Sequence, residues 1–272
     1  MKNLFLLLFL AFGLGLCSYS QETLSPKIIR KAYYADKTPP LREMTIILPG
    51  ERQREWKNSE IGNPSIKMIP PAPKTPVVYE NLQETTGILG SRGPIKSIPG
   101  IGNVNGVYPP DTEGAVGPDH YFQMINLSFA IWDKNGTKLY GPVDNSTLWE
   151  GFIGAWTGSN DGDPIVLYDV NADRYVASQF AIERPNGKSY QLVAISATGD
   201  PLGEYYRYAF EFDHFNDYPK MSTWHDGYYC TFNFFESGFI GSGVAAFERD
   251  KMLVGDPDAG MIFFGYFPDK FR

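Results

Sequence analysis

The chain has little cysteine and histidine, with two and three residues among 272. Cys17 lies in the apolar N-terminal run, so removal or modification of that run leaves Cys230 alone and no intrachain disulfide is expected. His120, His214 and His225 form neither an HExxH motif nor another close pair. A zinc hydrolase is therefore not indicated, because zinc needs several nitrogen or sulfur ligands at close spacing.

Several nucleotide-binding and nucleophile motifs are also missing. The sequence has no GxSxG elbow, no GxxxxGK loop and no GxGxxG after a strand-like run. Serine esterase, nucleoside triphosphatase and dinucleotide-binding functions therefore lack support. The net charge is -7 and the basic residues are scattered. Nucleic acids and anionic membranes need a concentrated positive patch, so neither is an expected partner.

The first twenty residues have the pattern of a signal peptide. Lys2 precedes an apolar run from Leu4 to Leu16, and Ser18-Tyr19-Ser20 comes before Gln21, the expected new N-terminus. The run is too short to span a bilayer, so we expect a secreted or outer-surface protein without a membrane span. Lipidation at Cys17 is the open alternative, although Leu16 stands where a lipobox has a small residue.

Residues 21–100 are rich in proline, with eleven in the segment. Proline lacks an amide donor and fixes its own φ, so an interior sheet or a long helix is excluded here. The composition predicts an extended leader with at most one or two short strands. Two roles stay open for it, a strap or propeptide laid across the main domain, and a loosely ordered linker.

Residues 101–272 consist of short β-branched and aromatic runs, such as "PIVLYD" and "SYQLVAISAT", separated by turn residues. The breaks contain Asn135-Gly136, Asn186-Gly187 and Asp226-Gly227, which favour hairpin turns. No window has a sustained apolar period of 3.6 residues. The sequence therefore predicts an all-β, antiparallel domain over 101–272.

This domain contains an internal repeat. Three units begin at Asp111, Asp163 and Asp217, and each continues with a short strand, a polar turn, an aromatic residue and a second strand. Spacings of 52 and 54 residues fit four strands with their turns, which is the size of a β-propeller blade. We predict about three four-stranded blades. The recurrent aspartates are interpreted as turn residues that accept bonds from nearby backbone amides.

A further step of 52 residues from Asp217 reaches Asp269, close to Arg272. Propellers normally have at least four blades, and each blade buries its faces on its neighbours. We therefore expect an incomplete propeller, followed by further blades or modules or closed by association.

Five segments together resemble a known group of proteins: "PPDTEGAVGPDHYFQMIN", "IWDKNGTKL", "DGDPIVLYDVNADRYVASQFA", "AISATGDPLGEYYRYAF" and "NDYPKMSTWHDGYY". In this set the chain is similar, over roughly 100–255, to large secreted bacterial proteins with a β-propeller region. The resemblance implies a secreted or surface protein, often with modules after the propeller, and no well-established activity.

The stretch "SATGDPLGEYY" is similar to the sialidase-type Asp box. Thr198, Asp200 and Gly203 match its pattern with one inserted residue, and Tyr205 or Tyr206 replaces its terminal aromatic. That box lies in the turn between the third and fourth strands of a blade. The resemblance implies a structural turn and carries no catalytic role.

One metal hypothesis comes from "DVNAD", where Asp169, Asn171 and Asp173 place oxygen ligands at alternate positions, as in calcium loops. An EF-hand loop that begins at Asp169 would have Gly at its sixth position, where this chain has Arg174. The competing interpretation is a plain hairpin turn. No other cofactor is expected.

No catalytic residue can be assigned from the sequence. Glycoside hydrolysis needs two carboxylates about 5 to 10 Å apart, and sialidases add a Tyr-Glu pair and an arginine cluster whose pattern is absent here. Tryptophans and tyrosines could stack on sugar rings or anchor a protein. The leading hypothesis is a non-catalytic β-propeller scaffold that binds a glycan or protein at the cell surface. The alternative is an exported, sialidase-like glycoside hydrolase with carboxylates and arginines at the propeller axis.

Overall fold

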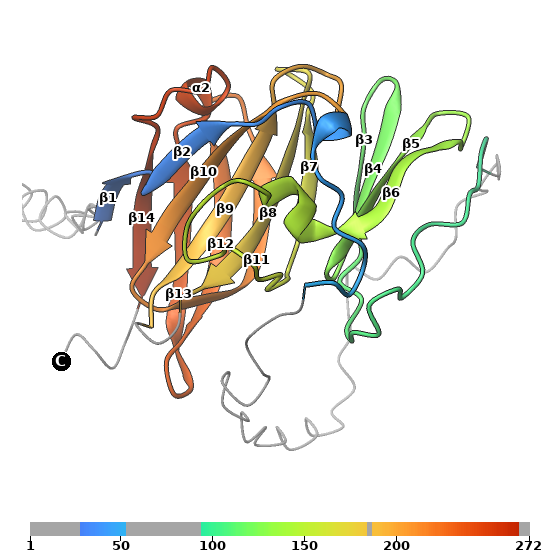
Figure 1. Cartoon of the computed structure of the whole chain (residues 1–272). Helices are drawn as coiled ribbons and strands as arrows, with labels where there is room; N and C mark the ends of the chain where they lie inside the picture. Colours follow the sequence, from blue (N-terminus) through green and yellow to red (C-terminus); the bar gives the residue numbers. More distant parts are fainter. Residues whose placement is uncertain (1–27, 53–93, 184–186, 267–272) are drawn as a thin grey trace, which may run out of the picture.

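The computed structural model describes residues 28–52, 94–183 and 187–266 (Figure 1). The predicted signal peptide at 1–20, with Cys17, and Asn186 lie outside the described residues. The prediction of an all-β, antiparallel fold is confirmed, because the described chain forms three antiparallel sheets with only short helical turns.

Each sheet is built from four strands that are consecutive in the chain. The first sheet contains β3 (Glu113–Val116), β4 (His120–Ile125), β5 (Ser128–Asp133) and β6 (Lys138–Asp144). The second contains β7 (Ile165–Asp169), β8 (Arg174–Ile182), β9 (Ser189–Ser196) and β10 (Tyr205–Phe212). The third contains β11 (Phe215–Thr223), β12 (Tyr228–Phe235), β13 (Phe239–Phe247) and β14 (Gly260–Tyr266).

The connections are mostly hairpins whose turns follow from local chemistry. Between β5 and β6, Asp133 accepts hydrogen bonds from the amides of Asn135 and Thr137, both at 2.8 Å. Gly136 has a φ of 85°, which glycine adopts without a steric penalty. Two 3-10 turns, η1 (Leu41–Glu43) and η3 (Asn145–Trp149), and the one-turn helix α2 (Arg249–Met252) complete the elements.

The proline-rich N-terminal region supplies a fifth strand to two of the sheets. β1 (Ile28–Lys31) pairs with β14, and β2 (Tyr34–Lys37) pairs with β10. Both are edge strands, and Pro39 and Pro40 come one residue after β2, beyond Thr38, whose amide makes the last hydrogen bond to Tyr205. Leu41 then inserts into the core with no exposed surface.

The three sheets stack face to face in chain order, which Figure 1 shows as green, yellow and orange-red layers. Alternating side chains of β10 serve the two interfaces: Tyr205 and Ala209 pack in the cluster against the first sheet, and Tyr208 and Phe210 pack in the cluster against the third. The second sheet is therefore buried on both faces. Each such large apolar side chain contributes about 1.5 to 3 kcal/mol.

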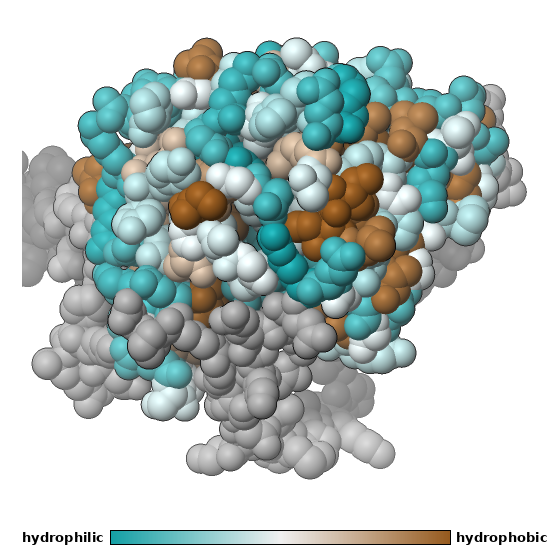
Figure 2. All heavy atoms as spheres, viewed as in Figure 1, coloured by the Kyte–Doolittle hydropathy of each residue, from teal (hydrophilic) through white to brown (hydrophobic). Residues whose placement is uncertain are grey.

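The strand that begins each sheet lies next to the strand that begins the next one, because β3 lies against β7 and β7 against β11. This arrangement brings the starts of the three predicted repeats together, although they are more than fifty residues apart in the chain. In the view of Figure 2 the surface is largely polar, with separate apolar islands.

Candidate functional site

A pocket of about 230 Å³ lies where the three repeats begin. Asp111 and Asp163 precede β3 and β7, and Asp217 belongs to β11. Eight residues line the pocket: Asp111, Thr112, Glu113, Asp163, Pro164, Tyr218, Pro219 and Lys220. Two of the three recurrent aspartates therefore line one cavity, and the third directly precedes a lining residue.

The backbone repeats more exactly than the side chains do. Asp111 has a φ of 38°, Asp163 of 45° and Tyr218 of 51°, all in the left-handed region. The alignment of the sequence pairs Asp217 with the other two aspartates, but its neighbour Tyr218 has the matching backbone. A register shift in the pairing of β11 with β12, between Asp217 and Lys220, accounts for the offset.

Left-handed backbone is costly for residues other than glycine and persists where the surroundings enforce it. At Asp111 the enforcement is visible, because Nδ2 of Asn126 donates to Oδ2 of Asp111 at 2.9 Å and to the carbonyl of Pro109 at 3.1 Å. At Asp163 and Tyr218 the next residue is a proline, Pro164 or Pro219, which disfavours right-handed helical backbone before it.

The carboxyl groups at this pocket shift one another's protonation. The pKa of Asp163 is raised to about 7, mainly by burial and also by the Asp217 and Asp111 carboxylates, while Lys220 and a hydrogen bond from the Tyr218 backbone lower it. Burial also raises the pKa of Asp217, again with a contribution from Asp111. For Glu113, burial raises the pKa and Lys220 lowers it. The site therefore combines crowded acidic groups with one cation.

Tyr218 and Lys220 form the other side of the pocket. The Tyr218 side chain is 56% exposed, and the Lys220 ammonium lies 4.3 Å from the centre of its ring. Such a cation over an aromatic face is an attractive contact that orients both groups. The pocket thus offers hydrogen-bond acceptors, a single charged donor and an accessible aromatic ring.

Sequence reasoning singled out the aspartates of this pocket and missed Glu113, Tyr218 and Lys220. The signal that could have found Tyr218 is the proline after it, which repeats the Asp163-Pro164 pair. No local pattern marks Glu113 or Lys220, since they join the pocket only through the stacking of the sheets.

The residues similar to an Asp box form the turn between β9 and β10. Oγ1 of Thr198 accepts from the Asp200 amide at 3.2 Å, and Oδ1 of Asp200 accepts from the Leu202 amide at 2.9 Å. The Gly203 amide donates to the Asp200 carbonyl at 3.1 Å. Asp200 also pairs with Arg42. These groups satisfy the turn and fasten the N-terminal segment to it.

The residues of the calcium hypothesis form the turn between β7 and β8. Asp169 is buried and accepts from Arg249 Nε at 2.7 Å, the Tyr228 hydroxyl at 3.0 Å and the Asn171 amide at 3.1 Å. Asn171 and Asp173 are exposed, and Asp173 accepts from the Tyr168 hydroxyl at 2.5 Å. Hydrogen-bond donors therefore surround the Asp169 carboxylate. Within 28–52, 94–183 and 187–266, no three His, Cys, Asp or Glu side chains are arranged to hold a metal ion.

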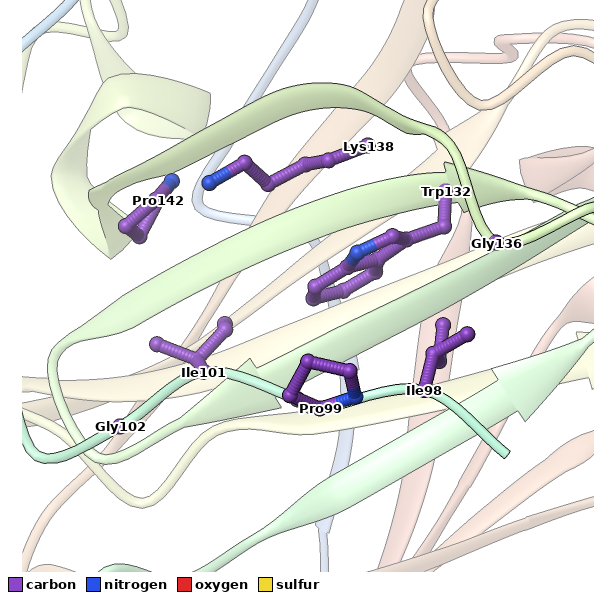
Figure 3. A pocket seen from close by; sticks show the side chains of 9 residues that line it. Ile98, Pro99, Ile101, Gly102, Trp132, Gly136, Lys138 and Pro142 are labelled. Atoms are coloured by element: carbon purple, nitrogen blue, oxygen red, sulfur yellow. The ribbon is translucent and has the colours of Figure 1, made fainter.

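A second pocket of about 370 Å³ lies on the outer face of the first sheet (Figure 3). Residues 98–102 cross this face, and their Ile98, Pro99 and Ile101 side chains lie near Trp132, with Lys138 on the opposite side. The Ile101 amide donates to Oε1 of Gln123 at 2.8 Å, which fixes the crossing segment to β4. Trp132 is only 4% exposed, so this pocket offers little aromatic surface to a ligand.

Comparisons with family models, with curated proteins and with solved structures find no match to this chain. No helix in the part of the chain that the structure describes is long and apolar enough to cross a membrane.

Proposed function

We propose that the chain is a secreted or cell-surface, non-catalytic scaffold of the β-propeller type, which binds a glycan at the pocket formed by the starts of its three repeats. The stacking of consecutive four-stranded sheets supports the propeller, since β3, β7 and β11 then take the positions of innermost strands. The signal-like N-terminus and the resemblance to secreted proteins support the location.

The observation that carries the proposal is the position of Tyr218. An exposed aromatic ring is held in left-handed backbone beside the Asp111 and Asp163 carboxyl groups and Lys220. Strained backbone that presents a side chain at a pocket points to a functional constraint. Sugar rings stack on tyrosine while their hydroxyls donate to carboxylates, so the pocket matches a polyhydroxylated ligand.

The test is a glycan array followed by isothermal titration calorimetry on the sugars that bind. Tyr218→Ala should weaken binding at least ten-fold, because the stacking surface is removed. Tyr33→Ala is the matched control, since Tyr33 is 61% exposed and does not line the pocket. Both variants should unfold at similar urea concentrations.

Two results would count against glycan binding. One is the absence of any bound sugar in an array of several hundred structures. The other is binding that Tyr218→Ala and Tyr33→Ala affect equally. If the chain instead binds a defined protein, and Tyr218→Ala abolishes that binding, then the ligand of this pocket is a protein and not a glycan.

The exported glycoside hydrolase is the second candidate, and the raised pKa of Asp163 favours it. A carboxylic acid that stays protonated near neutral pH beside further carboxylates is the pairing used by a general acid and its partner. The described residues that line the pocket include no arginine, which weighs against the sialidase version.

Hydrolysis is tested with chromogenic and natural glycans over a pH series. A hydrolase in which Asp163 is the acid should lose activity as pH rises through about 7. Asp163→Asn should then abolish turnover while the sugar still binds. Binding without turnover in the wild-type chain excludes this candidate and leaves the scaffold.

A further inference from the structure

The face of the third sheet that is turned away from the second sheet carries apolar side chains from β1, β14, β13 and β12, with polar side chains toward β11. The strand pairing places two neighbouring rows of side chains on this face, and each row runs across the strands of the sheet. The first row contains Ile29, Ile262, Ala246, Tyr229 and Ser222, and the second contains Phe264, Val244, Thr231 and Lys220. Ile29 is 72% exposed and Ile262 38% exposed. This outer face is therefore open among the residues that the structure describes.

The corresponding positions in the second sheet are used for sheet packing. There the equivalent row consists of Tyr206, Ile195 and Val176, which pack in the cluster between the second and third sheets. Val176 is fully buried at the position that Tyr229 takes in the third sheet. The first row on the outer face of the third sheet thus takes the register positions with which the second sheet packs against its neighbour.

At both interfaces between neighbouring sheets, a tyrosine hydroxyl of one sheet hydrogen-bonds to a turn of the sheet before it. Tyr175 of the second sheet donates to the carbonyl of His120 at 2.7 Å and accepts from the amide of Gly117 at 2.9 Å, in the β3–β4 turn. One repeat later, Tyr228 donates to Asp169, which takes the position of Gly117 in the β7–β8 turn. The following sheet therefore places its tyrosine on the first hairpin of the preceding sheet.

The third sheet has the same receiving turn. The Trp224 amide donates to the Gly227 carbonyl at 3.0 Å, and the Gly117 amide donates to the His120 carbonyl at the same distance. Trp224 is 62% exposed, so the turn is accessible. The hairpin between β11 and β12 therefore has the shape that accepts a tyrosine in the first repeat.

We infer that the outer face of the third sheet docks a fourth antiparallel sheet of the same repeat, whose tyrosine hydroxyl binds at Trp224 and Gly227. The apolar rows and the receiving turn both continue an interface that already occurs twice in the molecule. A second copy of the chain would have to offer Tyr121 on the outer face of its first sheet. Residues 98–101 already lie across that face, which favours a separate repeat unit as the occupant.

The experiment extends the chain by a second copy of its own residues 213–266, which supplies a sheet with a tyrosine at the required position. The probe is a cysteine at position 229 (Tyr229→Cys) in a Cys17→Ala background, since Cys230 is buried. Extension should slow thiol labelling at position 229 at least ten-fold. Ile153→Cys, a control position that is 66% exposed, should label at an unchanged rate.

The hydroxyl is tested by changing to phenylalanine the tyrosine of the appended copy that corresponds to Tyr228. Position 229 should then label several-fold faster than in the extended chain that keeps this tyrosine. Three outcomes would overturn the inference. In the first, circular dichroism shows that the appended copy is folded, but position 229 is labelled at the same rate as before. In the second, the appended copy stays unfolded. In the third, the unextended chain sediments as a dimer in which position 229 is already protected, which assigns the face to a second copy. None of these readouts depends on a bound glycan, so this test and that of the pocket fail separately.

Discussion

The Tyr228 hydroxyl of β12 donates a 3.0 Å hydrogen bond to Oδ2 of Asp169 at the end of β7. The same carboxylate accepts from Nε of Arg249 at 2.7 Å, and both side chains of this ion pair are at least nine-tenths buried. Burial alone would raise the pKa of Asp169, but the hydrogen bonds from Arg249 and Tyr228 stabilise the ionised carboxylate and hold its pKa below the ordinary value. A carboxylate that looks like a metal ligand in the sequence is therefore a joint between the second and third sheets.

Removing the contacts between Asp169, Arg249 and Tyr228 should lower the free energy of unfolding strongly. Asp169→Ala leaves the Arg249 guanidinium buried without its partner, so we expect a loss of about 3 to 5 kcal/mol in the free energy of unfolding. Tyr228→Phe removes one hydrogen bond and should cost about 1 to 3 kcal/mol. Urea denaturation measures both. Asp250→Ala is the control, since its carboxylate also meets Arg249 but is exposed; equal losses at positions 169 and 250 would contradict the assignment.

Arg207 should resist conservative replacement. Arg207 is 2% exposed, and its guanidinium donates to both carboxylate oxygens of Asp36 at 2.9 and 2.7 Å and to the carbonyls of Leu148 and Glu150. Lysine cannot reproduce this planar set of donors, so Arg207→Lys should be clearly destabilising. Asp36→Ala should cost about 3 to 5 kcal/mol by urea denaturation.

The control for this pair is Lys37→Ala, which removes an exposed ion pair with Glu204 next to Asp36. Exposed pairs of this kind contribute about 0 to 1 kcal/mol. If Arg207→Lys and Lys37→Ala unfold at the same urea concentration, Arg207 does not fasten the N-terminal segment as the contacts indicate.

The Asp163 carboxyl should make stability fall with rising pH. Its pKa is about 7 in the folded chain and 3.8 in the reference state, so the folded chain binds more protons between these values. Its contribution is present in full below about pH 4 and is lost as pH rises to about 7. Relative to Asp163→Asn, the wild-type chain should therefore lose unfolding free energy across this window. Parallel pH profiles of the two proteins would refute the shift.

Cys230 should be chemically silent in the native chain. The side chain is 1% exposed, and burial raises the pKa of its thiol far above the ordinary value. In a Cys17→Ala background we expect iodoacetamide to label Cys230 only after unfolding. Cys230→Ser places a hydroxyl in the same apolar cluster and should cost about 1 to 3 kcal/mol. Rapid labelling of the native chain would contradict this burial.

The strands and hairpins could be predicted because their signals are local. Alternating apolar residues and turn pairs such as Asn135-Gly136 act over a few positions, and they gave the antiparallel all-β class and the turn between β7 and β8 correctly. The four-residue strands β1 and β2 carry almost no such signal. They become strands only because the outer edges of β14 and β10 supply hydrogen-bond partners.

At the pocket, too, the sequence shows which residues recur, and the tertiary contacts decide which of them meet. Sequence comparison found Asp111, Asp163 and Asp217 as recurrent residues and interpreted them as turn residues. It could not show that the first two share a pocket, nor that the irregular pairing of β11 presents Tyr218 in the third repeat. These facts depend on contacts between strands from different repeats.

The sequence by itself determined the all-β, antiparallel class and turns such as Asn135-Gly136, because side-chain alternation and turn geometry are properties of neighbouring residues. The tertiary structure decided which residues of the predicted repeats meet, because face-to-face stacking brings β3, β7 and β11 together although their starts lie 52 and 50 residues apart. It also decided that Asp169 binds Arg249 and Tyr228. A buried carboxylate takes its partners from whatever the packing places beside it, and no local pattern encodes that choice.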